Sequence, residues 1–343
     1  MSTKRKLASV QVIWDVSPIE GADRIEVVSV LGWKCVAKKG EFSRGDRCVY
    51  FEIDSFLPVD ERFEFLRSSS YRKSDLMGEG FRLRTQKMRG QISQGLVLPL
   101  SILPAGEYAT GQNVTEILGV RKWEVEERAT DGGTIIGDLP GAIPKTEETR
   151  VQAEPGLIDE LAGMPYYITT KLDGTSVTMY RMGGSCGVCG HNYEYADDGK
   201  SSFWKFARDR EVFERLETLG IDDVAIQGEF CGAGIQGNPL RLVTPNWFVF
   251  TVVDTKTRRR YGLERTRELC ERAGLSMVPV EETGEAFAYS SVEELLERAK
   301  GSYPNGGRKE GIVIRPLEPV YSPTIQGALS MKVINNDYLL KKR

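Results

Sequence analysis

The sequence predicts an α+β protein, with a β-rich barrel at the N-terminus followed by a mixed α/β domain built on antiparallel sheets. A chain of 343 residues is long enough for two domains. The first ~110 residues carry short β-branched and aromatic runs, whereas strand and helix patterns mix in the second half. We expect domains at 1–120 and 146–343, joined by a linker at 121–145.

The N-terminal domain is predicted to contain short strands with no strong helix between them. Val, Ile, Trp and Cys occur in short runs that are separated by Gly, Pro and Ser. This pattern is typical of a small barrel or sandwich. The expected strands are Ser9–Val16, Arg24–Val30, Trp33–Ala37, Arg47–Ile53, Phe81–Arg84 and Gly95–Leu100.

The linker is predicted from Asp-Gly-Gly, Leu-Pro-Gly and Ile-Pro-Lys sequences, and the second domain is expected to begin near Thr146. Apolar residues then recur at helical spacing in three segments, and Ser291 with Glu294 forms a capping-box pattern. The expected helices are Phe203–Leu219, Gly262–Ala273 and Ser291–Ala299, and the expected strands are Tyr166–Thr170, Ser176–Tyr180, Val224–Gln227, Trp247–Val253 and Gly311–Ile314.

Composition excludes several classes of protein. The 46 Lys+Arg and 49 Asp+Glu residues nearly cancel, which argues against nucleic-acid binding by bulk charge but permits a local basic groove. Six cysteines in this length do not make a disulfide scaffold. The one histidine, His191, excludes a multi-histidine metal site. We expect a cytoplasmic protein with no membrane partner, because no apolar run approaches ~18 residues and no signal peptide is evident.

A lysine motif, Lys171-Leu-Asp173-Gly-Thr-Ser, lies between two expected strands. A lysine held in such a turn can act as a nucleophile if its surroundings keep the amine neutral. The motif is short, and a β-turn with a solvated lysine is the alternative. Five further segments strengthen the catalytic interpretation. They are Cys189-Gly-His191-Asn192, Gly228-Glu229-Phe-Cys-Gly-Ala-Gly-Ile-Gln-Gly-Asn238, Trp247-Phe-Val-Phe250, Lys309-Glu310-Gly-Ile-Val-Ile-Arg315 and Ser330-Met-Lys332-Val-Ile334-Asn335.

In this order and spacing, the segments resemble the nucleotidyltransferase motifs of ATP-dependent polynucleotide ligases, and most closely those of RNA ligases. The resemblance covers about residues 145–342. It implies three steps: an amine attacks the α-phosphate of ATP and releases pyrophosphate, AMP moves to a 5′-phosphate end, and a 3′-hydroxyl displaces AMP. Charge on the phosphates calls for cations and a divalent metal, Mg²⁺ or Mn²⁺.

The resemblance also implies roles for individual residues. Lys171 is the nucleophile, and Lys332 contacts the α-phosphate and disfavours the protonated form of Lys171. Glu229 serves the ribose hydroxyls or a metal shell, and Glu310 lies near the catalytic metal. A solvated charge is the alternative for either glutamate taken alone.

Phe250 matches the aromatic residue that stacks on adenine, with Phe248 or Val253 as alternatives if the register differs. Asp173 orders the loop or positions the substrate ends. Arg150 is a candidate phosphate contact, and a solvated arginine is its alternative.

The chain departs from the family pattern at two positions. His191 stands before Asn192 where many relatives have arginine, so the charge of this nucleotide-binding position depends on pH. A neutral histidine in a local hydrogen bond is the alternative. Ile334 replaces the second lysine of the last motif, and Lys341, Lys342 or Arg315 are the candidate substitutes.

The N-terminal region resembles the oligonucleotide/oligosaccharide-binding (OB) module that precedes the catalytic domain in the Deinococcus-type RNA ligases. Only eight residues follow Asn335, so we expect no C-terminal barrel of the kind found in DNA ligases and capping enzymes. Cations and aromatics alternate around Trp33, as expected of a surface for nucleic acid. A second cationic cluster comprises Arg82, Arg84, Lys87 and Arg89.

The resemblance implies an ATP-dependent RNA ligase that seals 3′-OH/5′-phosphate nicks in duplexes through a lysyl-AMP, with RNA on the 3′-OH side. The expected partner is a nicked RNA or RNA/DNA duplex, and we expect a monomer. Two alternatives stay open: a DNA ligase or capping-type nucleotidyltransferase, and a non-catalytic OB-type RNA-binding protein. The change at Ile334 is the only feature that favours the last.

The second cationic cluster gives a testable prediction. Replacing Arg84 and Lys87 with alanine should weaken nucleic-acid binding for all sequences equally and reduce the salt slope of log K by about 1 to 2, because two phosphate contacts are lost. A salt titration of binding checks this. An unchanged slope would remove the cluster from the interface.

Overall fold

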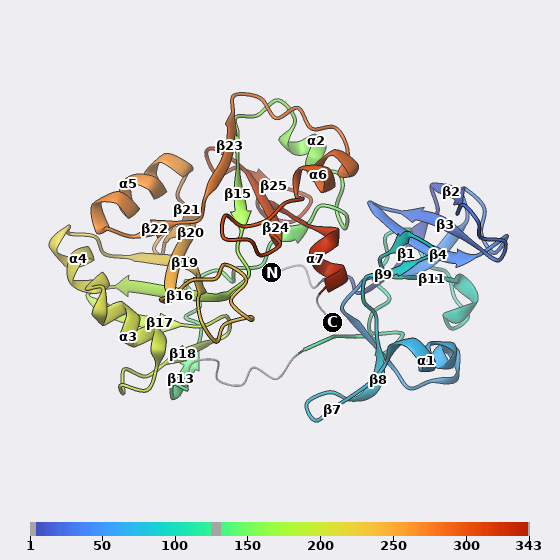
Figure 1. The fold of residues 1–343 in the computed structure, drawn as a ribbon, viewed down its shortest axis with the longest axis horizontal. Coiled ribbons are helices and arrows are strands. Elements are labelled where there is room, and N and C mark those ends of the chain that lie inside the picture. Colours follow the sequence, from blue (N-terminus) through green and yellow to red (C-terminus); the bar gives the residue numbers. More distant parts are fainter. Residues whose placement is uncertain (1–4, 125–131, 342–343) are drawn as a thin grey trace. The chain divides into compact units, whose positions relative to one another are not determined.

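The structure is a computed structural model of the chain, and it describes residues 5–124 and 132–341. The chain folds into two compact units, and segments distant in sequence contribute to each. Their order along the chain is visible in Figure 1. The N-terminal unit comprises residues 1–126, 152–155 and 339–343. The second unit comprises residues 127–151 and 156–338, and we call it the catalytic unit after the resemblance stated above.

The N-terminal unit consists mainly of short strands, as predicted. They hydrogen-bond in the orders β1-β5-β11, β2-β3-β4, β12-β6-β8-β7 and β10-β9. The elements are β1 (Ala8–Val12), β2 (Asp15–Pro18), β3 (Ile25–Val30), β4 (Trp33–Lys38), β5 (Arg47–Phe51), β6 (Ser55–Pro58), η1 (Glu61–Leu66), α1 (Arg67–Ser70), β7 (Tyr71–Ser74), β8 (Gly78–Arg82), β9 (Gln86–Met88), β10 (Gln91–Ser93), β11 (Leu96–Pro99), η2 (Leu100–Ile102) and β12 (Arg121–Lys122).

Two expectations for this unit need adjustment. The segment Ser9–Val16 forms two strands, because the Ile13 N–H bonds to Asp46 and the Trp14 N–H bonds to Ser29, so the chain changes its pairing partner there. A short helical turn, η1, also interrupts the strands, and the Asp60 side chain caps its first turn. The core lies in two clusters of buried residues, one of which includes Trp33.

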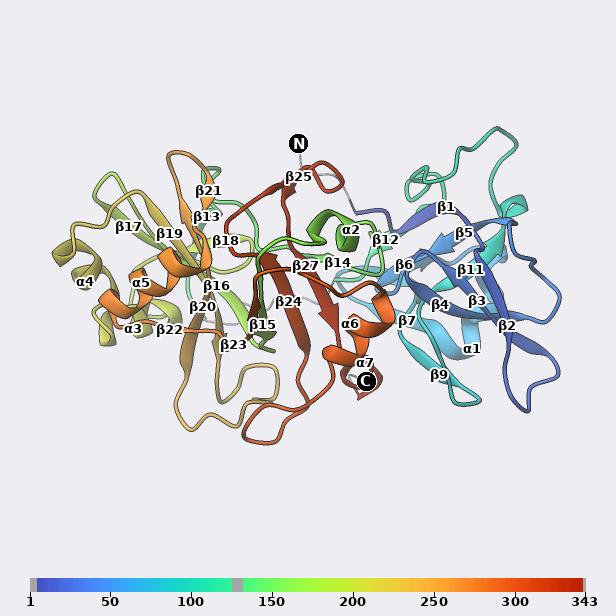
Figure 2. The ribbon, with the colours of Figure 1, turned by 90° about the horizontal axis from the view of Figure 1, so that it is seen from above.

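The catalytic unit contains two larger sheets, of eight and five strands. Figures 1 and 2 show them from two directions. The elements are β13 (Ile135–Asp138), β14 (Thr149–Arg150), α2 (Leu157–Leu161), β15 (Tyr166–Lys171), β16 (Thr175–Met182), β17 (Ser185–Cys189), β18 (Tyr193–Tyr195), α3 (Ser202–Asp209), α4 (Val212–Thr218), β19 (Val224–Cys231), β20 (Asn246–Asp254), β21 (Arg259–Arg260), α5 (Leu263–Ala273), β22 (Ser276–Met277), β23 (Val280–Gly284), α6 (Val292–Arg298), β24 (Gly311–Pro316), β25 (Tyr321–Ser322), β26 (Gly327–Ala328) and β27 (Met331–Ile334), and α7 (Asn336–Lys341) contains the sequence boundary between the units.

Helices α3, α4 and α5 cover one face of the eight-stranded sheet, whose order is β13-β18-β17-β16-β19-β20-β21 with β22 beside β20. Apolar residues alternate along the strands, so that Val177 and Phe230 pack with the helices in one core cluster. Their neighbours Ser176 and Glu229 pair across β16 and β19 and point to the opposite face. That face is therefore available for polar chemistry.

The five-stranded sheet, β14-β27-β24-β15-β23, follows the same rule. Ile168, Ile312 and Val333 pack with α2 and α6 in a second core cluster. Alternate residues of the same strands, including Lys171 on β15, point away from these helices. Each sheet therefore has one face that helices cover and one polar face.

Two predictions in this half differ from the structure. The predicted linker 121–145 contains two short strands among its described residues, since β12 pairs with β6 and β13 pairs with β18. Both strands are exposed along their whole length and are too short to show a strand pattern in the sequence. Residues 125–131 of the predicted linker lie outside the described residues. The predicted helix Phe203–Leu219 is two helices, α3 and α4. Glu211 between them adopts a left-handed conformation (φ 52°), which no helix interior contains.

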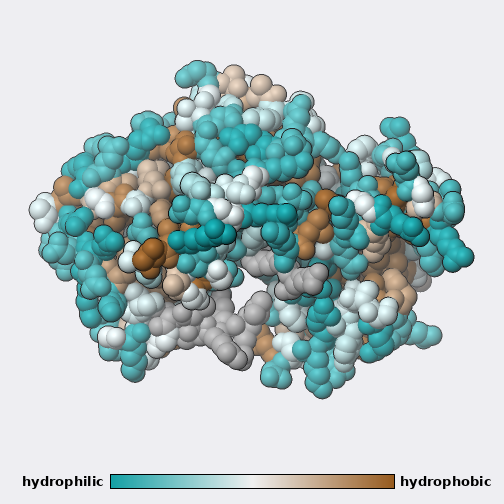
Figure 3. Space-filling model, viewed as in Figure 1, coloured by the Kyte–Doolittle hydropathy of each residue, from teal (hydrophilic) through white to brown (hydrophobic). Residues whose placement is uncertain are grey.

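The face of the molecule in Figure 3 is mostly hydrophilic, with hydrophobic residues scattered over it. Isolated exposed apolar residues of this kind are ordinary in globular proteins. Among the described residues, no helix is long and apolar enough to cross a membrane.

Candidate active site

The polar faces of the two sheets of the catalytic unit enclose a cavity of about 200 Å³. Lys171 and Arg315 come from the five-stranded sheet, and Glu229 and Phe250 come from the eight-stranded sheet. The cavity is lined by Thr146, Glu148, Thr169, Thr170, Lys171, Leu172, Ser176, His191, Glu229, Phe250, Val278, Val313 and Arg315.

Lys171 is the last residue of β15, and Glu310 immediately precedes β24. Lys171 Nζ donates a hydrogen bond to Glu310 Oε2 at 2.7 Å. Burial lowers the pKa of Lys171, but the charges of Glu310 and Glu229 and the hydrogen bond outweigh burial, so the pKa lies above its ordinary value. We expected the charge of Lys332 to lower the pKa of Lys171. The charges that act on the amine are instead those of carboxylates, which raise the pKa. Without a nucleotide, the lysine is held protonated.

Glu229 completes a group of carboxylates around the lysine. Its Oε1 accepts a hydrogen bond from the Gly174 N–H at 3.0 Å, which fixes the turn of the lysine motif. Burial, assisted by the charges of Glu310 and Asp173, raises the pKa of Glu229 to about 7 despite the opposing effect of Lys171. Anions held this close favour the binding of a cation between them.

The carboxylates do not make a complete metal cage. The described residues include no group of three or more His, Cys, Asp or Glu side chains arranged to hold a metal ion. Mg²⁺ and Mn²⁺, however, commonly bind through one or two carboxylates, with water and substrate phosphates as the other ligands. The pair Glu229 and Glu310 fits that mode.

Phe250 lies at a β-bulge in the cavity wall. The register of β19 and β20 shifts between Gln227 and Gly228, which pair with Thr251 and Val249, so Phe250 is the extra residue. Of the two alternatives considered for adenine stacking, Val253 is fully buried in a separate apolar cluster, and Phe248 is not among the cavity residues. Phe250 is two residues after Phe248, the partner of Glu229, so strand alternation places it on the same face as Glu229.

A row of paired residues crosses the five-stranded sheet next to the lysine. Thr169 pairs with Val313, Val313 pairs with Lys332, and Lys332 pairs in parallel with Arg150. Paired residues point to the same face, and Thr169 and Val313 line the cavity. The fold therefore places Lys332 and Arg150 side by side on the cavity face of this sheet.

Ile334 lies in the neighbouring row, where Lys171 pairs with Gly311 and Gly311 pairs with Ile334. Its side chain is buried. Among the candidate substitutes for the missing lysine, Arg315 lines the cavity, and its donors contact protein groups, as described below. Lys341 is exposed on α7, and Lys342 lies outside the described residues.

His191 and Asn192 occupy the turn between the antiparallel strands β17 and β18. His191 lines the cavity, with Nδ1 3.4 Å from Thr146 Oγ1 and Nε2 3.8 Å from Glu147 Oε1. Asn192 Oδ1 accepts a hydrogen bond from Lys145 Nζ at 3.0 Å. Of these two predicted residues, only His191 belongs to the cavity wall.

Arg315 is buried and forms hydrogen bonds with several residues of the cavity wall. Its Nη1 donates to the Phe250 carbonyl at 2.7 Å and to Thr251 Oγ1 at 3.0 Å, and its Nε donates to Ser330 Oγ at 3.1 Å. Its Nη2 donates to Glu148 Oε1 at 2.6 Å. Because buried charges require partners, this set of bonds fixes the strand that carries Phe250.

Sequence reasoning missed several residues of this wall, of which Glu148 and Thr169 are the most informative. Thr169 is two residues before Lys171 on β15, so strand alternation alone places it on the same face. Glu148 stands beside Glu147 in an acidic segment where no pattern distinguishes it. Its role depends on Arg315, which is 167 residues distant along the chain.

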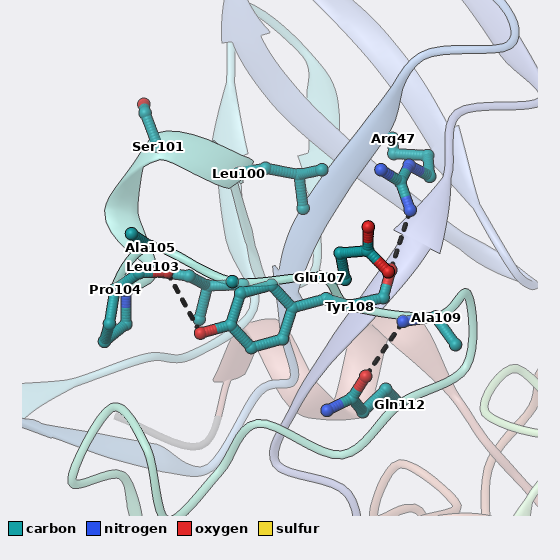
Figure 4. Close-up of a pocket in the computed structure, with 11 residues that line it drawn as sticks. Arg47, Leu100, Ser101, Leu103, Pro104, Ala105, Glu107, Tyr108, Ala109 and Gln112 are labelled. Carbon is teal, nitrogen blue, oxygen red and sulfur yellow. Dashed lines mark hydrogen bonds between the residues drawn. The ribbon is translucent and has the colours of Figure 1, made fainter.

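A larger cavity, of about 770 Å³, lies in the N-terminal unit (Figure 4). It is lined by a loop that follows β11. Arg47 Nη1 donates to the carbonyl of Tyr108 at 2.7 Å, and the Tyr108 hydroxyl donates to the carbonyl of Pro104 at 3.0 Å. Arg47 is the only cation among the described residues that line it, and none of the lysine-motif residues belongs to it. The candidate active site is therefore identified by the residues that line its cavity, not by the volume of the cavity.

A lysine among carboxylates and an aromatic side chain, held between two sheets in a chain that also carries a separate β-rich unit, defines the polynucleotide ligase class. A family model for an OB-fold domain matches residues 7–100, and a family model for RNA ligase matches residues 164–334. The chain belongs to the RNA ligase family. A comparison with curated proteins gave no match.

Solved structures of the Naegleria gruberi RNA ligase resemble the whole chain. A mutant without ligands is 36% identical to this chain and superposes with a TM-score of 0.89. The match covers 98% of this chain and 97% of the mutant's chain. A mutant with AMP and Mn has the same identity and TM-score, with 98% of each chain covered. A mutant with ATP and Mn is also 36% identical, covers 97% of this chain and 98% of its own, and has a TM-score of 0.88.

The Arg315 network predicts a pH-dependent stability. Burial raises the pKa of Glu148, but Arg315 and Arg260 outweigh it and lower the pKa to about 2. A lowered carboxyl pKa stabilises the fold above pH ~4.5, and this stabilisation is lost as the pH falls toward 2. At pH 7, the free energy of unfolding of Glu148→Gln should therefore be about 3 kcal/mol lower than that of the wild type. This difference should shrink below pH ~4.5.

Urea unfolding followed by tryptophan fluorescence between pH 7 and pH 3.5 measures this difference. Glu268→Gln is the matched control, since Glu268 pairs with Arg272 on the exposed side of α5 and should show no such pH dependence. A Glu148→Gln deficit that stays constant down to pH 3.5 would contradict the assignment.

Proposed function

We propose that this chain is an ATP-dependent RNA ligase that seals 3′-OH/5′-phosphate nicks in duplexes, with RNA on the 3′-OH side. The observation that carries the proposal is the position of Lys171, which lines the cavity opposite Phe250 and Glu229 and whose amine donates a hydrogen bond to Glu310. ATP is the nucleotide, and the N-terminal unit binds the nucleic acid. RNA ligase family membership supports the ligase activity, the ATP and AMP complexes of the Naegleria gruberi enzyme support the nucleotide, and the OB-fold match supports nucleic-acid binding.

In the first step, Lys171 Nζ attacks the α-phosphate of ATP. A bond forms between nitrogen and phosphorus, the bond to the β-phosphate oxygen breaks, and pyrophosphate leaves with the electron pair. Glu310 Oε2 already accepts a hydrogen bond from the amine and is placed to take its proton. Phe250 stacks on the adenine, Asp173 orders the loop, and Lys332 with Arg150 faces the phosphates.

A divalent cation, Mg²⁺ or Mn²⁺, supplies positive charge for the phosphates and lowers the pKa of Lys171 when bound. Glu310 and Glu229 are the residues of this chain that would hold it. Their close approach and the raised pKa of Glu229 support that assignment. His191 and Asn192 complete the proposed nucleotide site, with His191 inside the cavity.

AMP then moves to a 5′-phosphate end, and a 3′-hydroxyl displaces it. The duplex aligns the two ends, so the protein needs little sequence readout. We further propose that the chain acts as a monomer on nicked RNA or RNA/DNA hybrids in the cytoplasm. All six cysteines are free, which suits a reducing compartment.

The covalent step is tested by incubating the pure protein with α-labelled ATP and Mg²⁺ or Mn²⁺, followed by denaturation. Wild-type protein should retain the label, and Lys171→Ala should retain none because the nucleophile is gone. Lys256→Ala is the matched control, since Lys256 is an exposed lysine of the same unit paired with Asp223, and it should label fully. A wild-type protein that stays unlabelled after treatment with pyrophosphate would overturn the proposal.

The 3′-end requirement is tested with two nicked duplexes that differ only in the 2′-hydroxyl of the terminal nucleotide on the 3′-OH side. A site that reads this hydroxyl should seal the deoxynucleotide end at least about 100-fold more slowly. Single-turnover sealing rates provide the measurement. Equal rates would remove the RNA requirement while leaving the covalent step intact.

A further inference from the structure

A buried tyrosine hydroxyl joins the backbones of the two central active-site residues. Tyr303 Oη donates a hydrogen bond to the carbonyl of Lys171 at 2.9 Å and accepts one from the N–H of Glu310 at 3.1 Å. The side chain is only 4% exposed. Tyr303 itself lies outside both strands and is not among the residues that line the cavity.

The hydroxyl occupies the end of a β-ladder. Strands β15 and β24 pair from Tyr166 with Pro316 to Lys171 with Gly311, which is the last pair. Beyond this pair, Glu310 no longer pairs with β15, and the tyrosine oxygen bridges the two chain segments instead. Because the oxygen makes one bond with each segment, it sets their separation where the Lys171 and Glu310 side chains meet.

Tyr303 is well fixed for this task. Its N–H bonds to the carbonyl of Gly307 at 2.7 Å, and its carbonyl accepts from the N–H of Gly306 at 2.9 Å, which closes a tight turn. Its ring packs in an apolar cluster with Leu172 and Val278. A rigid turn and a packed ring leave the hydroxyl little freedom.

Glu310 is held from its other side as well. Its carbonyl accepts a hydrogen bond from the N–H of Asn335 at 2.9 Å, and Asn335 Nδ2 donates to the carbonyl of Lys309 at 3.0 Å. The Glu310 backbone is therefore clamped between Asn335 and Tyr303. Of these two residues, the tyrosine is the one that also bonds to the Lys171 backbone.

We propose that Tyr303 is a positioning residue for the first chemical step, because its hydroxyl sets the distance between the Lys171 amine and the Glu310 carboxylate. This inference rests on the proposed function. In that step, the lysine nitrogen bonds to the α-phosphorus, pyrophosphate departs with the electrons of the broken bond, and the lysine proton passes to Glu310. Proton transfer and attack both depend on sub-ångström placement of these two groups.

Tyr303→Phe removes one oxygen and preserves the ring. It leaves a buried carbonyl and a buried N–H without this partner, so the ends of the two strands should shift. At saturating ATP, we expect single-turnover labelling of Lys171 to slow by about 10- to 100-fold. The Kd for ATP should stay within about 2-fold, because the residues that contact the nucleotide are untouched.

Tyr180→Phe is the matched control. Its hydroxyl donates to Glu194 Oε1 within the same unit. The Tyr180 ring packs in an apolar cluster that contains neither Leu172 nor Tyr303, so labelling should proceed at the wild-type rate. Sealing of a nick whose 5′ end already carries AMP is the second measurement. The lysine is not the nucleophile in that reaction, so Tyr303→Phe should slow it far less than labelling.

The outcomes separate the two proposals. Slow labelling with normal ATP affinity and well-preserved sealing supports the positioning role. Labelling at the wild-type rate, or an equal loss of labelling and sealing, overturns it. An unlabelled wild-type protein would instead refute the proposed function itself.

Discussion

The 2.7 Å contact between Lys171 and Glu310 constrains much of the catalytic unit. An amine and a carboxylate partly removed from water must be paired, and they must also face a ligand. The fold meets both demands by giving each sheet one apolar face and one polar face. Helices α2 and α6 cover the first sheet from behind, and α3, α4 and α5 cover the second, so that the polar faces form the cavity.

The cavity wall then needs its own fixation, because the aromatic residue that faces the lysine lies on a bulge. A bulge leaves the ladder locally unpaired. Arg315 compensates by donating to the Phe250 carbonyl while its charge is balanced by Glu148. The buried Arg315 guanidinium thus connects the two sheets. Glu148, which also lines the cavity, influences the position of Phe250 through its hydrogen bond with Arg315.

The sequence predicted those features of the structure that depend on a local pattern of residues. The expected strand before the lysine motif predicted that Lys171 lies at a strand end, and β15 ends at Lys171. Ser291 caps α6 by accepting a hydrogen bond from the Glu294 N–H, as its spacing indicates. The motif order placed Phe250 among the nucleotide contacts. Sequence did not predict the bulge at Phe250 or the role of Glu148, because each depends on residues far along the chain. It also missed the left-handed Glu211, because the apolar spacing continues across the break between α3 and α4.

Ile334 shows how one departure from the family pattern changes the local electrostatics. It shares a row with Lys171 across the sheet, with Gly311 between them, so the two residues are two strands or roughly 10 Å apart. A lysine at this position would bring a second cation into the row of the nucleophile, whereas isoleucine is buried there. The cations Lys332 and Arg150 lie one row away. Carboxylates are therefore the nearest charges to the Lys171 amine, and removal of its proton depends on what neutralises them.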